Sequence, residues 1–70
     1  PEFDQLYAAA KAAQKRRIGP WGPSPIDYPT KQKQLGILAR RGFSYSIARR
    51  VLEASIKDAE EWIFKGEAST

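Results

Sequence analysis

Residues 18–29 of this chain, IGPWGPSPIDYP, constrain its fold more than any other segment. They contain four of the five prolines and two of the five glycines of the 70-residue sequence. Each proline fixes φ and removes a backbone donor, so this stretch is predicted to be a non-helical connector. The connector separates a short N-terminal segment from a longer C-terminal one. A chain of this length is expected to form a single small domain.

The segment before the connector predicts one helix, from about Asp4 to Arg17. It is rich in strong helix formers, and Asp4 is a suitable N-cap. Leu6, Ala10 and Ala13 recur at helical spacing and predict the buried stripe. Because this stripe is mostly alanine, it buries little area on its own.

The segment after the connector predicts a second helix that ends near Arg41. Asp27 or Thr30 is suited to cap its start. Its expected inward residues are Leu35, Leu38 and Ala39. Gly42 follows at the position where glycine takes a positive φ at low cost, which predicts a sharp stop.

A third helix is predicted from Tyr45, with Ser44 as its N-cap. Its inward residues are expected to be Ile47, Ala48, Val51 and Leu52. The helical pattern continues past residue 54, so this helix is expected to extend toward Gly66. No strand pattern is present. The predicted fold class is therefore all-α: a helix-turn-helix-like pair preceded by an N-terminal helix.

The sequence also suggests boundaries for the domain. We interpret residues 1–3 as the remnant of a cloning site and residues 4–66 as one helical unit. Residues 67–70 are expected to be a frayed tail.

Cysteine and histidine are both absent. Their absence excludes zinc fingers, cysteine or histidine nucleophiles, and Ser-His-Asp hydrolysis. No glycine-rich nucleotide loop is present. We therefore expect a non-enzymatic protein without a cofactor or a small-molecule substrate. No apolar run is long enough to span a membrane, and a cysteine-free chain fits a reducing cytoplasm.

Basic residues are concentrated in the first fifty positions, which hold ten of the twelve lysines and arginines but only three of the eight acidic residues. Arginine binds carboxylate and phosphate in a bidentate fashion, so this region favours an anionic partner. The alternative is that these residues only keep the surface soluble. The candidate binding residues are Lys11, Lys15, Lys31, Lys33, Arg40, Arg41, Arg49 and Arg50.

Trp21, within the connector, has two interpretations. It can fold back over the alanine face of the first helix, or it can serve as an exposed anchor for a partner, since tryptophan is enriched at binding hot spots.

Residues 31–54, KQKQLGILARRGFSYSIARRVLEA, resemble the last repeat of RecX, the bacterial regulator of the RecA recombinase. The resemblance is carried by Arg41-Gly42-Phe43, by Ser44 as the cap, and by Arg49-Arg50-Val51-Leu52. The preceding AAAKAAQKRRIGPW, residues 8–21, is similar to the helix and basic turn that open this repeat in some members.

The resemblance implies a three-helix unit from a protein built of tandem units. Such proteins lie along the groove of the RecA–DNA filament, where they inhibit its activity in recombination and the SOS response. The expected partners are RecA or its nucleoprotein filament, with non-specific DNA contacts. The residues after position 54 have no counterpart in the repeat.

Two other functions compete with this one. The second and third helices have the outline of a helix-turn-helix DNA-binding domain, although Tyr45 and Ser46 are poor base readers. A ubiquitin-associated-like adaptor also has a glycine–aromatic–serine turn before an alanine- and leucine-rich helix, but the basic excess fits it less well.

Overall fold

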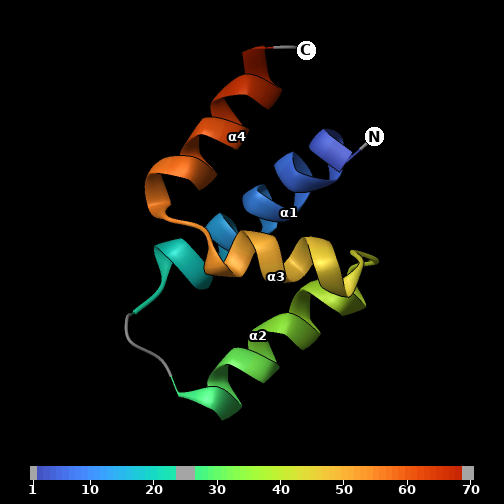
Figure 1. Cartoon of the computed structure of the whole chain (residues 1–70), viewed down its shortest axis with the longest axis vertical. Helices are drawn as coiled ribbons and strands as arrows, with labels where there is room; N and C mark the ends of the chain where they lie inside the picture. The colour runs from blue at the N-terminus through green and yellow to red at the C-terminus, as the bar shows by residue number, and fades with distance from the viewer. Residues whose placement is uncertain (1, 24–26, 69–70) are drawn as a thin grey trace.

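A computed structural model of the chain describes residues 2–23 and 27–68 (Figure 1). These residues contain helices and turns but no strand, so the all-α prediction is confirmed. The helix α1 lies between α3 and α4, and α2 packs on the opposite side of α3 (Figure 1). The elements are α1 Glu2–Arg16, the 3-10 turn η1 Gly19–Trp21, α2 Tyr28–Arg40, α3 Tyr45–Glu53 and α4 Ile56–Ala68.

Helix α1 begins at Glu2, so the prediction that Asp4 caps it is wrong. At its other end, the Arg17 N–H donates to the carbonyl of Gln14 and the Ile18 N–H donates to that of Ala13, at 3.1 and 3.0 Å. Two hydrogen bonds of this kind end a helix in which the residue after the last helical one has a left-handed backbone conformation. Arg17 adopts that conformation, with φ of 57°, which is costly for a residue with a Cβ atom.

The connector is shorter than predicted. Residues Gly19–Trp21 form a 3-10 turn, and Tyr28 and Pro29 already belong to α2, where the first turn tolerates proline. Gly19 is left-handed, with φ of 64°, and a Cβ atom there would lie 2.8 Å from Cδ2 of Leu52. The turn η1 therefore needs glycine to approach α3 this closely. The expected non-helical residues 24–26, which include the apolar Ile26, lie outside the described residues.

The turn between α2 and α3 has the predicted structure. Gly42 is left-handed, with φ of 98°. The N–H groups of Gly42 and Phe43 donate to the carbonyls of Ala39 and Leu38, at 3.0 and 3.3 Å. Ser44 caps α3, because its Oγ accepts a hydrogen bond of 3.2 Å from the Ile47 N–H. These local bonds fix the direction in which α3 leaves α2.

The inward face of α2 differs from the prediction at one position. Leu35 and Leu38 are buried, but Ala39 is exposed and Gln34 is buried in its place. The prediction for Ala39 was wrong because the face of α2 that is buried in the tertiary structure passes through Gln34, Leu35 and Leu38 and does not reach Ala39. Burial thus leaves Oε1 of Gln34 without a hydrogen-bond partner among the described residues.

The expected extension of the third helix is present as a separate helix. The backbone at Ala54 is extended, with ψ of 155°, and this ends α3. Oγ of Ser55 then accepts a hydrogen bond of 3.1 Å from the Asp58 N–H and caps α4. Gly66 lies inside α4 and does not end it, and α4 continues to Ala68, so Glu67 and Ala68 of the expected frayed tail are helical. Residues 69 and 70 lie outside the described residues.

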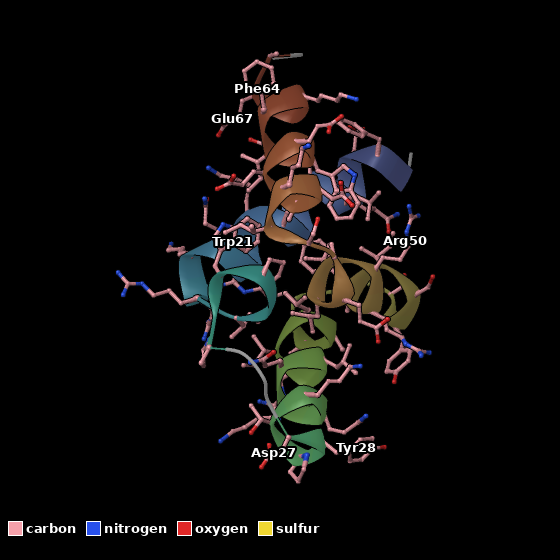
Figure 2. All side chains as sticks on the ribbon, turned by 60° about the vertical axis from the view of Figure 1, so that its left-hand side comes forward. Trp21, Asp27, Tyr28, Arg50, Phe64 and Glu67 are labelled. Carbon is pink, nitrogen blue, oxygen red and sulfur yellow. The ribbon has the colours of Figure 1, made fainter. Side chains whose placement is uncertain are left out.

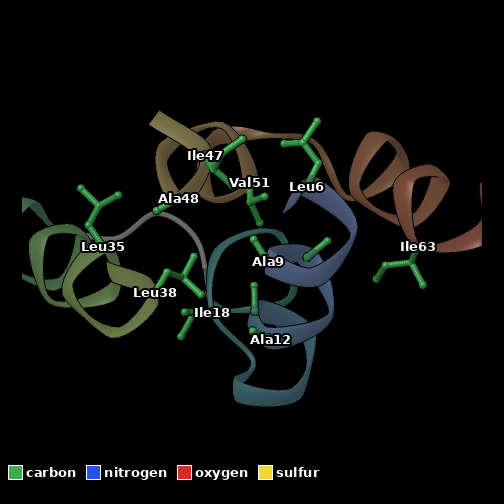
Figure 3. Packing of buried hydrophobic residues seen from close by; sticks show 12 residues of the cluster. Leu6, Ala9, Ala12, Ile18, Leu35, Leu38, Ile47, Ala48, Val51 and Ile63 are labelled. Atoms are coloured by element: carbon green, nitrogen blue, oxygen red, sulfur yellow. The ribbon is translucent and has the colours of Figure 1, made fainter. Parts of the chain in front are cut away.

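The core is centred on α1 (Figure 3). Its buried stripe is wider than predicted, since Ala9 and Ala12 are buried beside the expected residues. Small side chains allow neighbouring helices to approach closely, so α1 can contact α3, α4 and η1 at once. The remaining apolar residues of this cluster are Ile18, Leu35, Leu38, Ile47, Ala48, Val51 and Ile63.

Candidate functional site: two basic surfaces

The eight predicted binding residues all reach the surface. Seven are exposed, and Lys31 is half-buried. They do not form one continuous face. Six of them line two surfaces that share no lining residue, whereas Lys33 and Arg40 line neither.

The first surface, here called the α1 cleft, is an open depression of about 590 Å³ between α1 and the turn after α2. Lys11 and Lys15 are one helical turn apart on α1, and Arg41 follows the last residue of α2. Apolar parts of Tyr7 and Phe43 also line it, and both rings pack against the core. The complete lining is Tyr7, Ala8, Lys11, Ala12, Gln14, Lys15, Arg41 and Phe43.

An acidic residue of α4 forms an ion pair with one of the cations of the α1 cleft. The Nζ atom of Lys11 lies 3.0 Å from Oε2 of Glu67. The hydrogen bond and charge of Glu67 raise the pKa of Lys11 above its usual value. Of the three cations that line this cleft, Lys11 is therefore partly neutralised by Glu67, whereas Lys15 and Arg41 are not paired with Glu67.

The second surface, here called the tyrosine face, lies over α2 and α3. Its first depression has a volume of about 240 Å³ and is lined by Tyr28, Lys31, Gln32, Leu35, Tyr45 and Arg49. Its second depression, of about 520 Å³, shares Tyr45 and Arg49 with the first and adds Ser46, Arg50 and Glu53. The shared residues make the two depressions one continuous surface. Figure 2 shows Tyr28 and Phe64 toward opposite ends of the molecule, with Arg50 on α3 between them.

Glu53 organises the cations of the tyrosine face. Its Oε2 atom lies 2.7 Å from Nζ of Lys31 on α2 and 3.2 Å from Nε of Arg49 on α3. Hydrogen bonds from Lys31 and then Arg49 lower the pKa of the Glu53 carboxyl below its usual value. The carboxylate thus links two helices and holds both cations beside Tyr45.

Trp21 is half-buried and packs against the hydrophobic cluster (Figure 2). Its Nε1 atom is buried and has no hydrogen-bond partner among the described residues. This packing favours the interpretation that Trp21 covers the core over the interpretation that it anchors a partner.

Tyr28, Gln32 and Glu53 line the tyrosine face but are not among the site residues predicted from the sequence. A signal was available for the aromatic residues, since Tyr28 and Tyr45 each follow directly after an N-cap. The first helical position is solvent-facing in both helices, so this repeated pattern indicates two exposed rings. No sequence signal places Glu53 beside Lys31, because that contact crosses between helices.

Within residues 2–23 and 27–68, no three acidic side chains gather closely enough to hold a metal ion. None of the helices described there is long and apolar enough to cross a membrane.

Comparison with known proteins identifies relatives of this chain. The family model for the third three-helix domain of RecX matches residues 4–52. A curated relative, the regulatory protein RecX of Agrobacterium fabrum, is 35% identical over 60 residues, which cover 86% of this chain. The chain spans 33% of the length of that relative. No solved structure matches the chain.

Proposed function

The chain belongs to the RecX family of regulatory proteins, and on that premise we propose that it modulates RecA filaments by direct contact. The proposed effect is inhibition of filament activity in recombination and the SOS response. The setting is the bacterial cytoplasm, and the chain takes part without catalysing a reaction.

The observation that carries this proposal is the overlap between the family match and the basic surfaces. Residues 4–52 include most of α1, all of α2 and nearly all of α3, and this range contains all eight predicted cations. A filament of protein on DNA offers phosphates and carboxylates together. Cations spread over two surfaces can engage such an assembly at more than one point, and long-range attraction would speed their encounter.

The test is the steady-state ATPase rate of RecA on single-stranded DNA, measured with increasing amounts of the 70-residue chain. The full-length Agrobacterium fabrum relative serves as a reference. We expect the rate to fall as the chain is added. An unchanged rate, together with no co-sedimentation of the chain with RecA filaments, would contradict the proposal.

A charge-reversal variant tests the role of the arginines. Replacing Arg40, Arg41, Arg49 and Arg50 with glutamate removes Arg41 from the α1 cleft and Arg49 and Arg50 from the tyrosine face, and it should weaken the inhibition. All four are exposed, so the fold should survive, which circular dichroism can check. Equal potency of the variant and the unmodified chain would remove these arginines from the mechanism.

A second candidate is a DNA-binding domain of the helix-turn-helix type. The α2–turn–α3 geometry and the exposed Arg49 and Arg50 on α3 favour it. The start of α3 offers Tyr45 and Ser46, which supply few groups for reading base pairs. A sequence preference in gel-shift titrations with duplex DNA would support this candidate.

A further inference from the structure

Two exposed tyrosines frame the first depression of the tyrosine face. Tyr28 is 73% exposed and Tyr45 is 55% exposed. Each is the first residue of its helix. The caps before them hold both helix starts in place, with Asp27 accepting from the Thr30 N–H and Ser44 accepting from the Ile47 N–H. The rings are therefore presented from fixed backbone.

Positive charge lies directly beside these rings. Lys31 and Arg49 line the same depression as Tyr28 and Tyr45, and Arg50 lines the adjoining one. Glu53 is the acidic residue that lines this surface, so the lining residues carry a net positive charge. Exposed aromatic rings interleaved with lysine and arginine are the combination that binds unpaired nucleic acid strands.

We propose that the tyrosine face binds single-stranded nucleic acid, with bases stacked on Tyr28 and Tyr45 and phosphates held by Lys31, Arg49 and Arg50. This inference rests on the proposed function and deepens it by assigning the nucleic acid contact to one surface. A ring can stack on a base only where the base is released from its neighbours, so the exposed rings select single strands over duplexes.

The α1 cleft does not meet the same requirements. Its aromatic side chains, Tyr7 and Phe43, are half-buried and pack against the core, so they are not presented for stacking. Its Lys11 is paired with Glu67. The α1 cleft is therefore a basic surface without exposed aromatic rings, and it can be compared directly with the tyrosine face.

Glu53 sets the strength of the proposed contact. Its carboxylate bonds both Lys31 and Arg49, so an incoming phosphate must compete with it. Replacing Glu53 with glutamine removes the competing charge and leaves a side chain of the same shape. We expect Glu53→Gln to bind single strands more tightly, with a steeper dependence of affinity on salt concentration.

The experiment is fluorescence anisotropy of a labelled 20-nucleotide oligothymidine with the 70-residue chain at several salt concentrations. Tyr28→Ala and Tyr45→Ala should each weaken binding by roughly tenfold, within the range expected for loss of one stacked base. Tyr28→Phe and Tyr45→Phe should restore binding, because phenylalanine keeps the ring. Both tyrosines are exposed, so the variants should fold.

Charge controls come from the same helices. Lys31→Gln should weaken binding, whereas Lys33→Gln, two positions away on α2 and outside the tyrosine face, should change it less than twofold. Arg49→Gln should weaken binding in the same way as Lys31→Gln. Single strands bind basic grooves with an affinity that falls with salt, so the difference between Lys31→Gln and Lys33→Gln should shrink as salt rises.

Two outcomes would overturn the proposal. In the first, duplex DNA binds as tightly as the oligothymidine and the tyrosine variants lose nothing, which indicates contacts with phosphates alone. In the second, the tyrosine variants lose affinity for polyglutamate but keep it for the oligothymidine, which assigns this face to an acidic protein. Neither measurement contains RecA, so failure here is distinguishable from failure of the ATPase test.

Discussion

Gly66 and Gly36 both lie inside helices, but their surroundings are opposite. A Cβ atom on Gly66 would overlap Cγ and Cδ1 in the Tyr7 ring, where α4 crosses α1. A Cβ atom on Gly36 would meet nothing within 4 Å. Glycine is therefore required in α4 by close packing, while in α2 it only weakens the helix.

This contrast predicts opposite effects of one substitution. Gly36→Ala should raise the free energy of unfolding by about 1 kcal/mol through helix propensity. Gly66→Ala should lower it by about 1–3 kcal/mol, because overpacking against Tyr7 outweighs the same propensity gain. Urea denaturation of both variants checks this. Equal stabilisation by both substitutions would mean that α4 does not pack on Tyr7.

Arg17 gives a second prediction at the residue scale. Its left-handed φ of 57° costs about 1 kcal/mol for a residue with a Cβ atom. Arg17→Gly should therefore stabilise the fold by several tenths of a kcal/mol or more, after the entropy cost of glycine. Thermal unfolding measures the change. Arg16→Gly is the control: because Arg16 is the last residue of α1, glycine at this position should lower the stability of the fold. Destabilisation by Arg17→Gly to the same extent would contradict this account.

At the scale of the elements, each boundary after α1 has a local cause. Asp27, Ser44 and Ser55 each accept a hydrogen bond from the backbone three residues on. Each of α2, α3 and α4 therefore begins where a side chain satisfies one of the first free N–H groups of the helix. The break before α4 has the sequence form of a capping box, with Asp58 three residues after Ser55.

The cap at Asp27 predicts a dependence of stability on pH. Hydrogen bonds from the Thr30 side chain and then its backbone lower the pKa of Asp27 in the folded chain. The carboxylate therefore stabilises the fold fully above its unfolded pKa of about 3.9, and this contribution is lost as pH falls through the folded pKa.

Asparagine caps helices about as well as aspartate but does not titrate. Asp27→Asn should therefore match the unmodified chain near neutral pH and lose less stability than it does as the pH falls from about 5 through the folded pKa of Asp27. Urea unfolding across this range provides the measurement. Parallel pH profiles for the two proteins would show that Asp27 is not held as a cap.

At the scale of the whole molecule, α4 adds a packed helix beyond the residues that the family model matches. The match ends at residue 52, whereas α4 occupies Ile56–Ala68 and buries Ala59, Ile63 and Gly66. Its main contact is α1, and Glu67 bonds Lys11 across that contact. The start of α1 and the end of α4 lie at the same end of the molecule (Figure 1).

Removing α4 should therefore weaken the fold. A chain that ends at residue 54 exposes the face of α1 that α4 covers, and loss of the buried Ile63 side chain alone is worth about 2 kcal/mol. We expect a lower urea midpoint and a smaller m-value, because less surface is exposed on unfolding. Identical midpoints for the short and full chains would show that α4 does not dock on α1.

The sequence by itself determined the helical class, the turn at Gly42 and the cap at Ser44. These features depend on hydrogen bonds and periodicity within a few residues, and such interactions can be read along the chain. The family resemblance has the same basis, since its residues surround this turn.

Tertiary structure alone decided which residues share a surface. Helix packing buried Gln34 and left Ala39 exposed, and the packing of α2 on α3 placed Glu53 within bonding distance of both Lys31 and Arg49. The separation of the cations into an α1 cleft and a tyrosine face has the same origin. These outcomes depend on how helices rotate and cross, and residue spacing within one helix carries no information about its neighbour.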